Sequence, residues 1–312
     1  MLLVTPVQFF HSLVVSLLSG NANIIRLSNT VFSQTTILCD CIQKALFDNN
    51  DIVNRICLVK YGHEKTITDW FSDICDVRII WGGNGTISKV RESSLQARAY
   101  DVPFADRFSF ALIDTEKYCS ITEKEKEALA LGFYFDTYFS DQNACNSPRL
   151  VVWHGCREAS LQAQKDFWKH LAVIVTEQYD LSVISGVDKL VAECAVFMNY
   201  EAAINKDCSV FNYINVVDLD EIDYKLAEYK GNSGLFLQFI TDDLRSVLQY
   251  VRKDWQTLAY FGFDSKQLLS LIVELGAKGV DRIVPIGRAG VPSFEWDGVS
   301  FLERLSRRIM TE

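Results

Sequence analysis

Residues 77–88 read Val-Arg-Ile-Ile-Trp-Gly-Gly-Asn-Gly-Thr-Ile-Ser and combine a strand, a turn and a helix signal. The apolar run 77–81 predicts a buried strand, and the glycines behind it predict a turn into a helix-like run at 87–92. Glycine lets a backbone approach a phosphate or a nicotinamide closely, and a helix N-terminus attracts anions. Since the G-x-G-x-x-G spacing is lacking, the stretch predicts either a dinucleotide contact or a turn without a ligand. The contact residues would be Gly82, Gly83 and Asn84.

Strand and helix signals alternate on both sides of this stretch. Upstream, the apolar runs 2–5, 23–27 and 56–59 predict strands, and 9–18 and 28–47 predict helices. Parallel strands that are buried on both faces read as continuous apolar runs joined by crossover helices. The sequence therefore predicts an α/β fold with a Rossmann-like parallel sheet. Downstream, strands are predicted at 108–113, 150–153, 234–239, 257–261 and 282–285, and helices at 116–139, 161–179, 243–253 and 266–275.

The composition of the 312 residues is that of a globular protein, with 49% hydrophobic and 23% charged residues. The formal net charge is −9 and no block of Lys and Arg occurs, which disfavours binding to nucleic acid or to an anionic membrane. The apolar N-terminus lacks a basic n-region and is too short to cross a bilayer. No nucleic-acid partner and no membrane span are therefore predicted.

The cysteines point to chemistry rather than to metal or disulfides. Nine Cys and four His occur without a C-x-x-C pair, so a zinc site is poorly supported. A chain of this size does not need disulfides, and reduced thiols predict a cytoplasmic protein. Cys145 lies in the polar loop Asp-Gln-Asn-Ala-Cys-Asn-Ser-Pro-Arg between a predicted helix and a strand, where α/β proteins carry reactive groups. It is either an activated nucleophile or an inert core thiol.

A basic residue ends the strand predicted within residues 20–28, which read Gly-Asn-Ala-Asn-Ile-Ile-Arg-Leu-Ser. At the C-terminal end of a parallel strand, Arg26 is placed to meet the ribose or the 2′-phosphate of a nucleotide, with Ser28 close by. The alternative is that Arg26 pairs with a surface carboxylate.

Together and in this order, these signals resemble the long-chain fatty acyl-CoA reductases of the bacterial luminescence system, a branch of the aldehyde dehydrogenase superfamily. The resemblance runs from residue 1 to about 305 and is weakest over 181–230. It rests on GNANIIRLS (20–28), WGGNGTIS (81–88), ADRFSFALID (105–114), FYFDTYFSDQNACNSPRLVVW (133–153) and VDRIVPIGRA (280–289), followed by WDG (296–298).

The resemblance assigns roles to residues at matching positions. Cys145 matches the family's nucleophile, Gly83 the glycine against the nicotinamide, and Asn84 a position near the diphosphate. Arg26 matches a basic position that faces the adenosine ribose. Gln8 is the nearest match to an Asn whose amide helps to bind the oxyanion, and its extra methylene changes that geometry.

The chain departs from the family pattern in three respects. Hydrolytic aldehyde dehydrogenases activate water with a Glu in the segment that here spans 102–107, and no Glu occurs there. Without that base a thioacyl enzyme resists hydrolysis, which suits a reductase that releases an aldehyde. The acid that binds the nicotinamide ribose is also missing, with Glu228 as a substitute. By the resemblance, the sequence starts at the first strand of the cofactor domain, so we expect the usual N-terminal region to be truncated, supplied separately or lost.

The resemblance implies an aldehyde dehydrogenase-like fold, with a cofactor-binding domain over 1–112, a catalytic domain over 113–286 and a C-terminal segment, 287–312, that returns to the first. It implies NADPH-dependent reduction of a fatty acyl thioester, from acyl-CoA or an acyl-protein, to the aldehyde through a thioacyl intermediate on Cys145. NADPH is preferred to NADH because Arg26 and Ser28 have no acidic neighbour at that strand end.

Two other classes stay open from the sequence. One is a non-catalytic remnant that binds a nucleotide or a partner chain, and the other is a transferase that uses the thiol without a cofactor. The surface on which the N-terminal region would pack predicts a homodimer or a separately supplied N-terminal region as partner.

Overall fold

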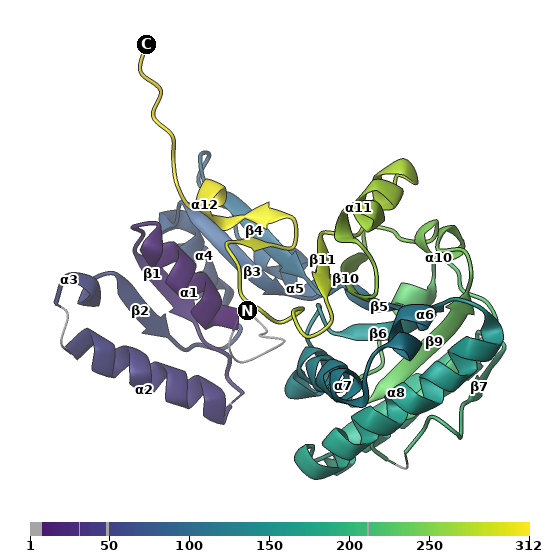
Figure 1. Ribbon diagram of the computed structural model, residues 1–312. Coiled ribbons are helices and arrows are strands. Elements are labelled where there is room, and N and C mark those ends of the chain that lie inside the picture. The colour runs from purple at the N-terminus through teal and green to yellow at the C-terminus, as the bar shows by residue number, and fades with distance from the viewer. Residues whose placement is uncertain (1–7, 31, 48–49, 211) are drawn as a thin grey trace. The chain divides into compact units, whose positions relative to one another are not determined.

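The computed structural model describes residues 8–30, 32–47, 50–210 and 212–312, which belong to two compact units (Figure 1). The first unit comprises the residues up to Asp106 together with Pro292–Glu312, and the second comprises Arg107–Val291. The sequence placed these boundaries near 112 and 287. Cofactor binding by the first unit and catalysis by the second stay predictions.

The first unit contains two short parallel strand pairs. β1 (Asn23–Arg26) pairs with β2 (Ile56–Val59), and β3 (Val77–Gly82) pairs with β4 (Tyr100–Ala105). Within the described residues these pairs form two separate sheets and not the single sheet that was predicted. The strand predicted at 2–5 lies outside the described residues. The helices of this part are α1 (Gln8–Leu18), α2 (Ser33–Phe47), α3 (Asn50–Val53), α4 (Lys65–Ile74) and α5 (Asn84–Arg91).

A cavity of about 620 Å³ lies in this unit, lined by residues from both strand pairs. The packed core lies beside it, where Trp81 stacks on Phe104 with ring centroids 4.2 Å apart. Trp81 Nε1 also donates a hydrogen bond to Ser12 Oγ of α1 at 2.9 Å. A smaller apolar cluster joins α1 to α2 and β1. The two strand pairs are thus packed on α1 separately.

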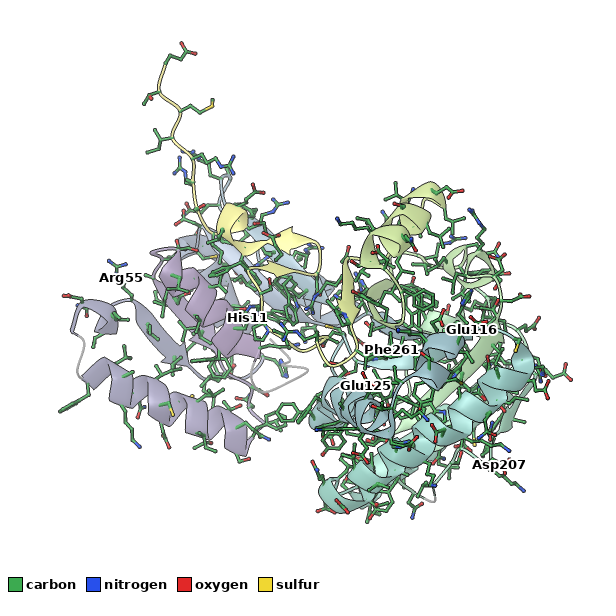
Figure 2. The ribbon with its side chains drawn as sticks, viewed as in Figure 1. His11, Arg55, Glu116, Glu125, Asp207 and Phe261 are labelled. Carbon is green, nitrogen blue, oxygen red and sulfur yellow. The ribbon has the colours of Figure 1, made fainter. Side chains whose placement is uncertain are left out.

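The C-terminal segment packs as part of the first unit, where it forms β12 (Glu295–Trp296), β13 (Val299–Ser300) and α12 (Phe301–Arg304). Phe301 is fully buried and contacts Phe104, with ring centroids 5.2 Å apart. The His11 ring on α1, labelled in Figure 2, lies 3.0 Å from the Ser293 carbonyl oxygen through its Nε2. These contacts fix the segment on α1 and β4.

One seven-stranded sheet runs through the second unit in the order β11-β10-β5-β6-β9-β8-β7. Neighbouring strands are parallel except β8 and β7, which are antiparallel. The mostly parallel sheet with flanking helices confirms the predicted α/β fold class. The strands are β5 (Phe108–Asp114), β6 (Pro148–His154), β7 (Ala202–Ile204), β8 (Asn215–Leu219), β9 (Leu235–Thr241), β10 (Trp255–Phe261) and β11 (Arg282–Pro285).

Helices cover both faces of this sheet (Figure 1). Side chains alternate along β5, so that Phe108 and Phe110 join one apolar cluster while Ala111 and Ile113 join the other. The second cluster packs under α7 and α8, and the first under α9, α10 and α11. The helices are α6 (Thr115–Ser120), α7 (Glu123–Thr137), α8 (Arg157–Gln178), α9 (Val183–Phe197), α10 (Arg245–Leu248) and α11 (Ser265–Glu274).

Local capping explains one difference from the sequence prediction. The single helix predicted at 116–139 is two helices, because Thr122 starts a new one. Its Oγ1 accepts from the Glu125 N–H at 3.4 Å, and Glu125 Oε2 accepts from the Thr122 N–H at 2.8 Å, which is a capping box. Glu125 is labelled in Figure 2.

Other elements were missed or overestimated. No clear sequence signal marks α9 or β8, and none marks β4, whose apolar pattern is broken by Pro103 and Asp101. The helix predicted at 243–253 shrinks to the four residues of α10.

Candidate active site

Cys145 lies in a turn between the 3-10 helix η1 (Tyr138–Ser140) and β6 in the second unit. Its side chain carries a thiol outside any disulfide, and the residue is 4% exposed. Ser109 Oγ of β5 donates to the Cys145 carbonyl oxygen at 2.6 Å and accepts from the Thr257 N–H of β10 at 3.1 Å. One buried hydroxyl therefore ties the cysteine turn to two neighbouring strands of the sheet.

A buried glutamine holds the start of this loop. Asp141 and Gln142 both have positive φ, 52° and 58°, which non-glycine residues adopt rarely. The fully buried Gln142 side chain offsets that cost: its Nε2 donates to the carbonyls of Pro148 at 3.0 Å and Leu235 at 3.1 Å. Its Oε1 accepts from the Gly234 N–H at 3.1 Å. The loop backbone is thus fixed by a side chain within it.

A buried cation completes the loop on the β6 side. Arg149 is 4% exposed and donates to three backbone carbonyls, of Gly231 at 3.1 Å, Gln142 at 3.1 Å and Arg107 at 3.3 Å. The planar guanidinium satisfies several acceptors at fixed angles, which a lysine ammonium does less well. Arg149 of β6 therefore places a positive charge beside the loop that carries Cys145 and joins that loop to two other segments.

Asn146, the residue after Cys145, binds a second segment of the chain. Its Nδ2 donates to the Ala289 carbonyl at 2.6 Å, and Arg282 Nη1 donates to the same oxygen at 2.7 Å. The buried Asp136 of α7 accepts from the N–H groups of Gly287 at 2.6 Å and Ala289 at 2.9 Å. Burial raises the pKa of Asp136 to about 6, against the opposing effect of its N–H donors.

The glycines of the first unit lie at the end of β3. Gly83 precedes α5 with an ordinary φ of −67°, whereas Gly82 has φ of 154°. A Cβ placed on Gly83 or Gly85 would meet no atom within 4 Å. The first turn of α5 contains no acidic residue, so its N-terminal partial charge favours an anion. Open space and bare backbone at a helix N-terminus fit the close approach of a dinucleotide.

Arg26 ends β1 as predicted, and within the described residues it contacts a backbone carbonyl and an aromatic ring rather than a surface carboxylate. Its contact with a nucleotide stays a prediction. Its Nη2 donates to the Gly62 carbonyl, and its guanidinium lies over the Tyr61 ring, 4.5 Å from the centroid. Arg26 Nε is buried and makes no hydrogen bond within the described residues. Ser28 Oγ accepts from the Thr30 N–H at 3.1 Å.

Gln8 is the first residue of α1 and belongs to the first unit, whereas Cys145 belongs to the second. The Gln8 Oε1 atom is buried and has no hydrogen-bond partner in the described part of the chain. The structure therefore places Gly82, Gly83 and Asn84 together at one strand end and Cys145 in a separate unit. The oxyanion role of Gln8 stays a prediction.

Two further polar groups have structural partners. His154 Nδ1 lies 3.6 Å from Asp114 Oδ2, and its ring packs on Phe263, in keeping with a structural role. Glu123, Asp166 and His170 lie close enough to hold a metal. Lys126 Nζ occupies that group, however, at 2.9 Å from the Glu123 and 2.8 Å from the Asp166 carboxylate oxygen.

Sequence reasoning missed the supports of Cys145. The residues concerned are Ser109, Asp136, Gln142 and Arg149. Asp136 and Arg149 had a usable signal, because each is a charged residue inside an aromatic or apolar run. Buried charges need partners, so such residues mark places where chain segments are tied together.

A comparison with known proteins identifies the family of the chain. The profile of the acyl-CoA reductase (LuxC) family matches residues 4–308. No curated protein matches the chain. Within the described residues, no helix is long and apolar enough to cross a membrane.

Among solved structures, the fold is similar to an oxidoreductase from Marinobacter aquaeolei, with a TM-score of 0.63, 12% identity, and 90% of this chain and 60% of that chain covered. A succinic semialdehyde dehydrogenase from Streptococcus pyogenes in complex with NADP+ gives 0.59 and 10%, with 86% and 59% covered. A bifunctional proline utilization A protein gives 0.62 and 12%, with 89% and 29% covered. The chain thus spans from about a third to three fifths of the length of these proteins.

Proposed function

The chain belongs to the acyl-CoA reductase (LuxC) family, and on this premise we propose that it reduces a fatty acyl thioester to the aldehyde with NADPH, through a thioacyl intermediate on Cys145. The observation that carries the proposal is the Cys145 turn, which Ser109, Gln142, Asn146 and Arg149 hold between β5, β6 and the 286–290 segment. These contacts hold the backbone at Cys145 in one arrangement, as a positioned nucleophile requires.

In the proposed reaction, the Cys145 thiolate attacks the acyl carbonyl carbon, and the C–S bond to the donor breaks as the donor thiol leaves. The Cys145 N–H and the Gln8 amide would hold the oxyanion. When bound, NADPH supplies the hydride that reduces the thioacyl carbon. The resulting thiohemiacetal then loses its hydroxyl proton and expels the Cys145 thiolate, which releases the aldehyde. Since residues 102–107 contain no Glu, water is not activated against the intermediate at that position.

The cofactor residues of the proposal are Gly82, Gly83, Asn84, Arg26 and Ser28. Bare backbone at Gly83 supports close approach of the dinucleotide, and the place of Arg26 at the C-terminal end of β1 supports a contact with a ribose 2′-phosphate. The preference for NADPH rests on Arg26, so direct titration should give tighter binding of NADPH than of NADH, and Arg26→Ala should remove the difference. Tighter binding of NADH to the unmodified protein would contradict this preference.

The decisive experiment is intact-mass analysis after mixing the protein with a long-chain acyl-CoA, with and without NADPH. We expect one acyl adduct that Cys145→Ala lacks and that NADPH removes with release of aldehyde. Cys208→Ala is the matched control, because Cys208 is equally buried and burial raises the pKa of its thiol to about 12. This control should still become acylated.

A second candidate is a non-catalytic member that binds a nucleotide or a partner chain. It is favoured by the first unit, where the two strand pairs are separate and flank a cavity of about 620 Å³. A folded protein that binds NADPH but never forms an adduct would support it. An adduct on Cys145 without any dinucleotide binding would instead indicate an acyltransferase.

A further inference from the structure

Helix α9 of the second unit has an apolar face toward solvent and charged side chains toward the protein interior. Apart from Asp188, its exposed side chains are mostly apolar, and its buried ones include two charges. The exposed fraction is 86% at Val183, 58% at Leu190 and 83% at Met198 just past the helix end. The exposed face as a whole comprises Val183, Ile184, Val187, Leu190, Val191, Cys194 and Met198. This spacing places them on one stripe of the helix, which we name the α9 stripe.

Polar contacts on the opposite side fix this orientation. Lys189 Nζ donates to the Asn212 carbonyl at 2.6 Å, and Glu193 Oε2 accepts from Asn215 Nδ2 at 2.6 Å. Both charged residues are almost fully buried, and burial lowers the pKa of Lys189 to about 8. Turning the helix to bury the stripe would break both hydrogen bonds and separate Lys189 and Glu193 from their present partners. The apolar face is therefore held outward, which marks an interaction surface.

We propose that the α9 stripe packs against the α9 stripe of a second copy of this chain, in an antiparallel two-fold contact. The stripe is symmetric about a point between Leu190 and Val191. In that register Val187 faces Cys194 of the partner subunit, and Val183 faces Met198 of the partner subunit. An isologous interface requires such self-complementarity, and antiparallel helices place the positive end of each dipole beside the negative end of the other.

The lack of charge on the α9 stripe favours a second copy over other occupants. The single basic residue of α9, Lys189, is buried and Asp188 is exposed, so the stripe lacks the cations that bind anionic lipid. It also offers no charge pattern for a charged partner. Helix α9 is about 22 Å long, and its side chains expose on the order of several hundred Å² of apolar surface. Stable interfaces bury roughly 800 Å² per partner, so we expect a concentration-dependent dimer.

The test is sedimentation of the full chain over a range of concentrations, with Leu190→Glu as the variant. We expect a mass that approaches twice 35.5 kDa for the unmodified protein and a dimer dissociation constant at least tenfold higher for the variant. Val173→Glu on α8 is the matched control, because Val173 is 56% exposed and Leu190 58%. A monomer at every concentration, or equal weakening by both variants, would overturn the proposal.

Cross-linking tests the register without a charge in the helix. Oxidation of Val187→Cys should give a disulfide-linked dimer with Cys194 of the partner subunit, and the added change Cys194→Ser should abolish it. A Cys194–Cys194 link in the unmodified protein would indicate a parallel pair and overturn the antiparallel contact. Flotation of the unmodified protein with phosphatidylcholine–phosphatidylserine vesicles would show that the stripe binds lipid instead. Sedimentation and cross-linking do not depend on reductase activity. The proposed α9 contact can therefore fail or succeed independently of the proposed function.

Discussion

The two units of the molecule differ in how their strands are joined. In the second unit seven strands share one sheet, and the inner strands β5 and β6 are almost completely buried. In the first unit, β1–β2 and β3–β4 are separate pairs that flank a cavity, and β1 and β2 are half-buried or exposed. The unit that carries the thiol is thus closely packed, and the unit that carries the glycine turn is not.

The candidate catalytic residue is held more tightly than the candidate cofactor residues. The Cys145 turn is held by side chains that bond to backbone groups of other segments, so it has few alternative arrangements. The candidate cofactor residues rely on bare backbone at Gly83 and on one arginine. Segments with fewer buried contacts open more easily, and a bound ligand stabilises the state that it binds. We expect the first unit to respond more strongly to NADPH.

The largest effect should come from Arg149→Met, which removes the buried cation of the second unit. Three carbonyl groups lose their donor, and buried acceptors without partners are costly, so the free energy of unfolding should fall by about 3–5 kcal/mol. Urea unfolding measures this loss. Arg149→Lys should reduce the free energy of unfolding by less, since lysine keeps the positive charge although it lacks the planar guanidinium.

The matched change in the first unit is Arg78→Met. Arg78 bonds to Asp101 at 2.7 Å, and both side chains are slightly exposed, so solvent compensates part of the loss. A larger destabilisation by this change than by Arg149→Met would break the comparison between the units.

The next effect concerns pH and Asp136. Its pKa of about 6 in the folded protein lies above the ordinary 3.8. Between these values the unfolded chain carries the charge while the folded chain stays neutral, so the free energy of unfolding falls as pH rises through 6. The total change is about 3 kcal/mol. Asp136→Asn should remove this slope, which urea titrations at several pH values would show. Parallel pH curves for the two proteins would contradict the assignment.

The first unit should show the opposite sign. Burial raises the pKa of Asp101, but the hydrogen bonds and charges of Arg78 and Arg91 outweigh it and hold the pKa below the ordinary value. Its contribution to stability is present above the unfolded pKa and is lost as pH falls. Asp101→Asn should therefore reduce the fall in the free energy of unfolding as the pH is lowered. Asp136→Asn should make that fall steeper, because it removes a contribution that grows toward low pH.

The features that could be predicted from the sequence are those that depend on residues close together in the chain. Strands such as β6 and β10 and the Cys145 loop were predicted, because apolar runs and turn residues are local signals. The split at Thr122 was missed although its capping box is local, because the charged residues on both sides of it suit a single helix as well as two. The outward apolar face of α9 and the bonds of Asp136 depend on contacts more than a hundred residues apart or on partners of other elements. No spacing within the chain specifies these.

The smallest predicted effect concerns Gly83 in the turn after β3. Gly83 has an ordinary φ and empty space around its missing side chain, so neither strain nor packing requires glycine there. Gly83→Val should leave the fold intact and weaken NADPH binding about tenfold, since the added methyl groups would occupy the approach path. Protection of β3 amides from hydrogen exchange by NADPH should fall by about 1.4 kcal/mol when the NADPH concentration lies well above both dissociation constants. Acylation of Cys145 should be unchanged, so the adduct would persist longer. Equal affinity in this variant and in Gly186→Ala, a control in the second unit, would show that the turn holds no dinucleotide.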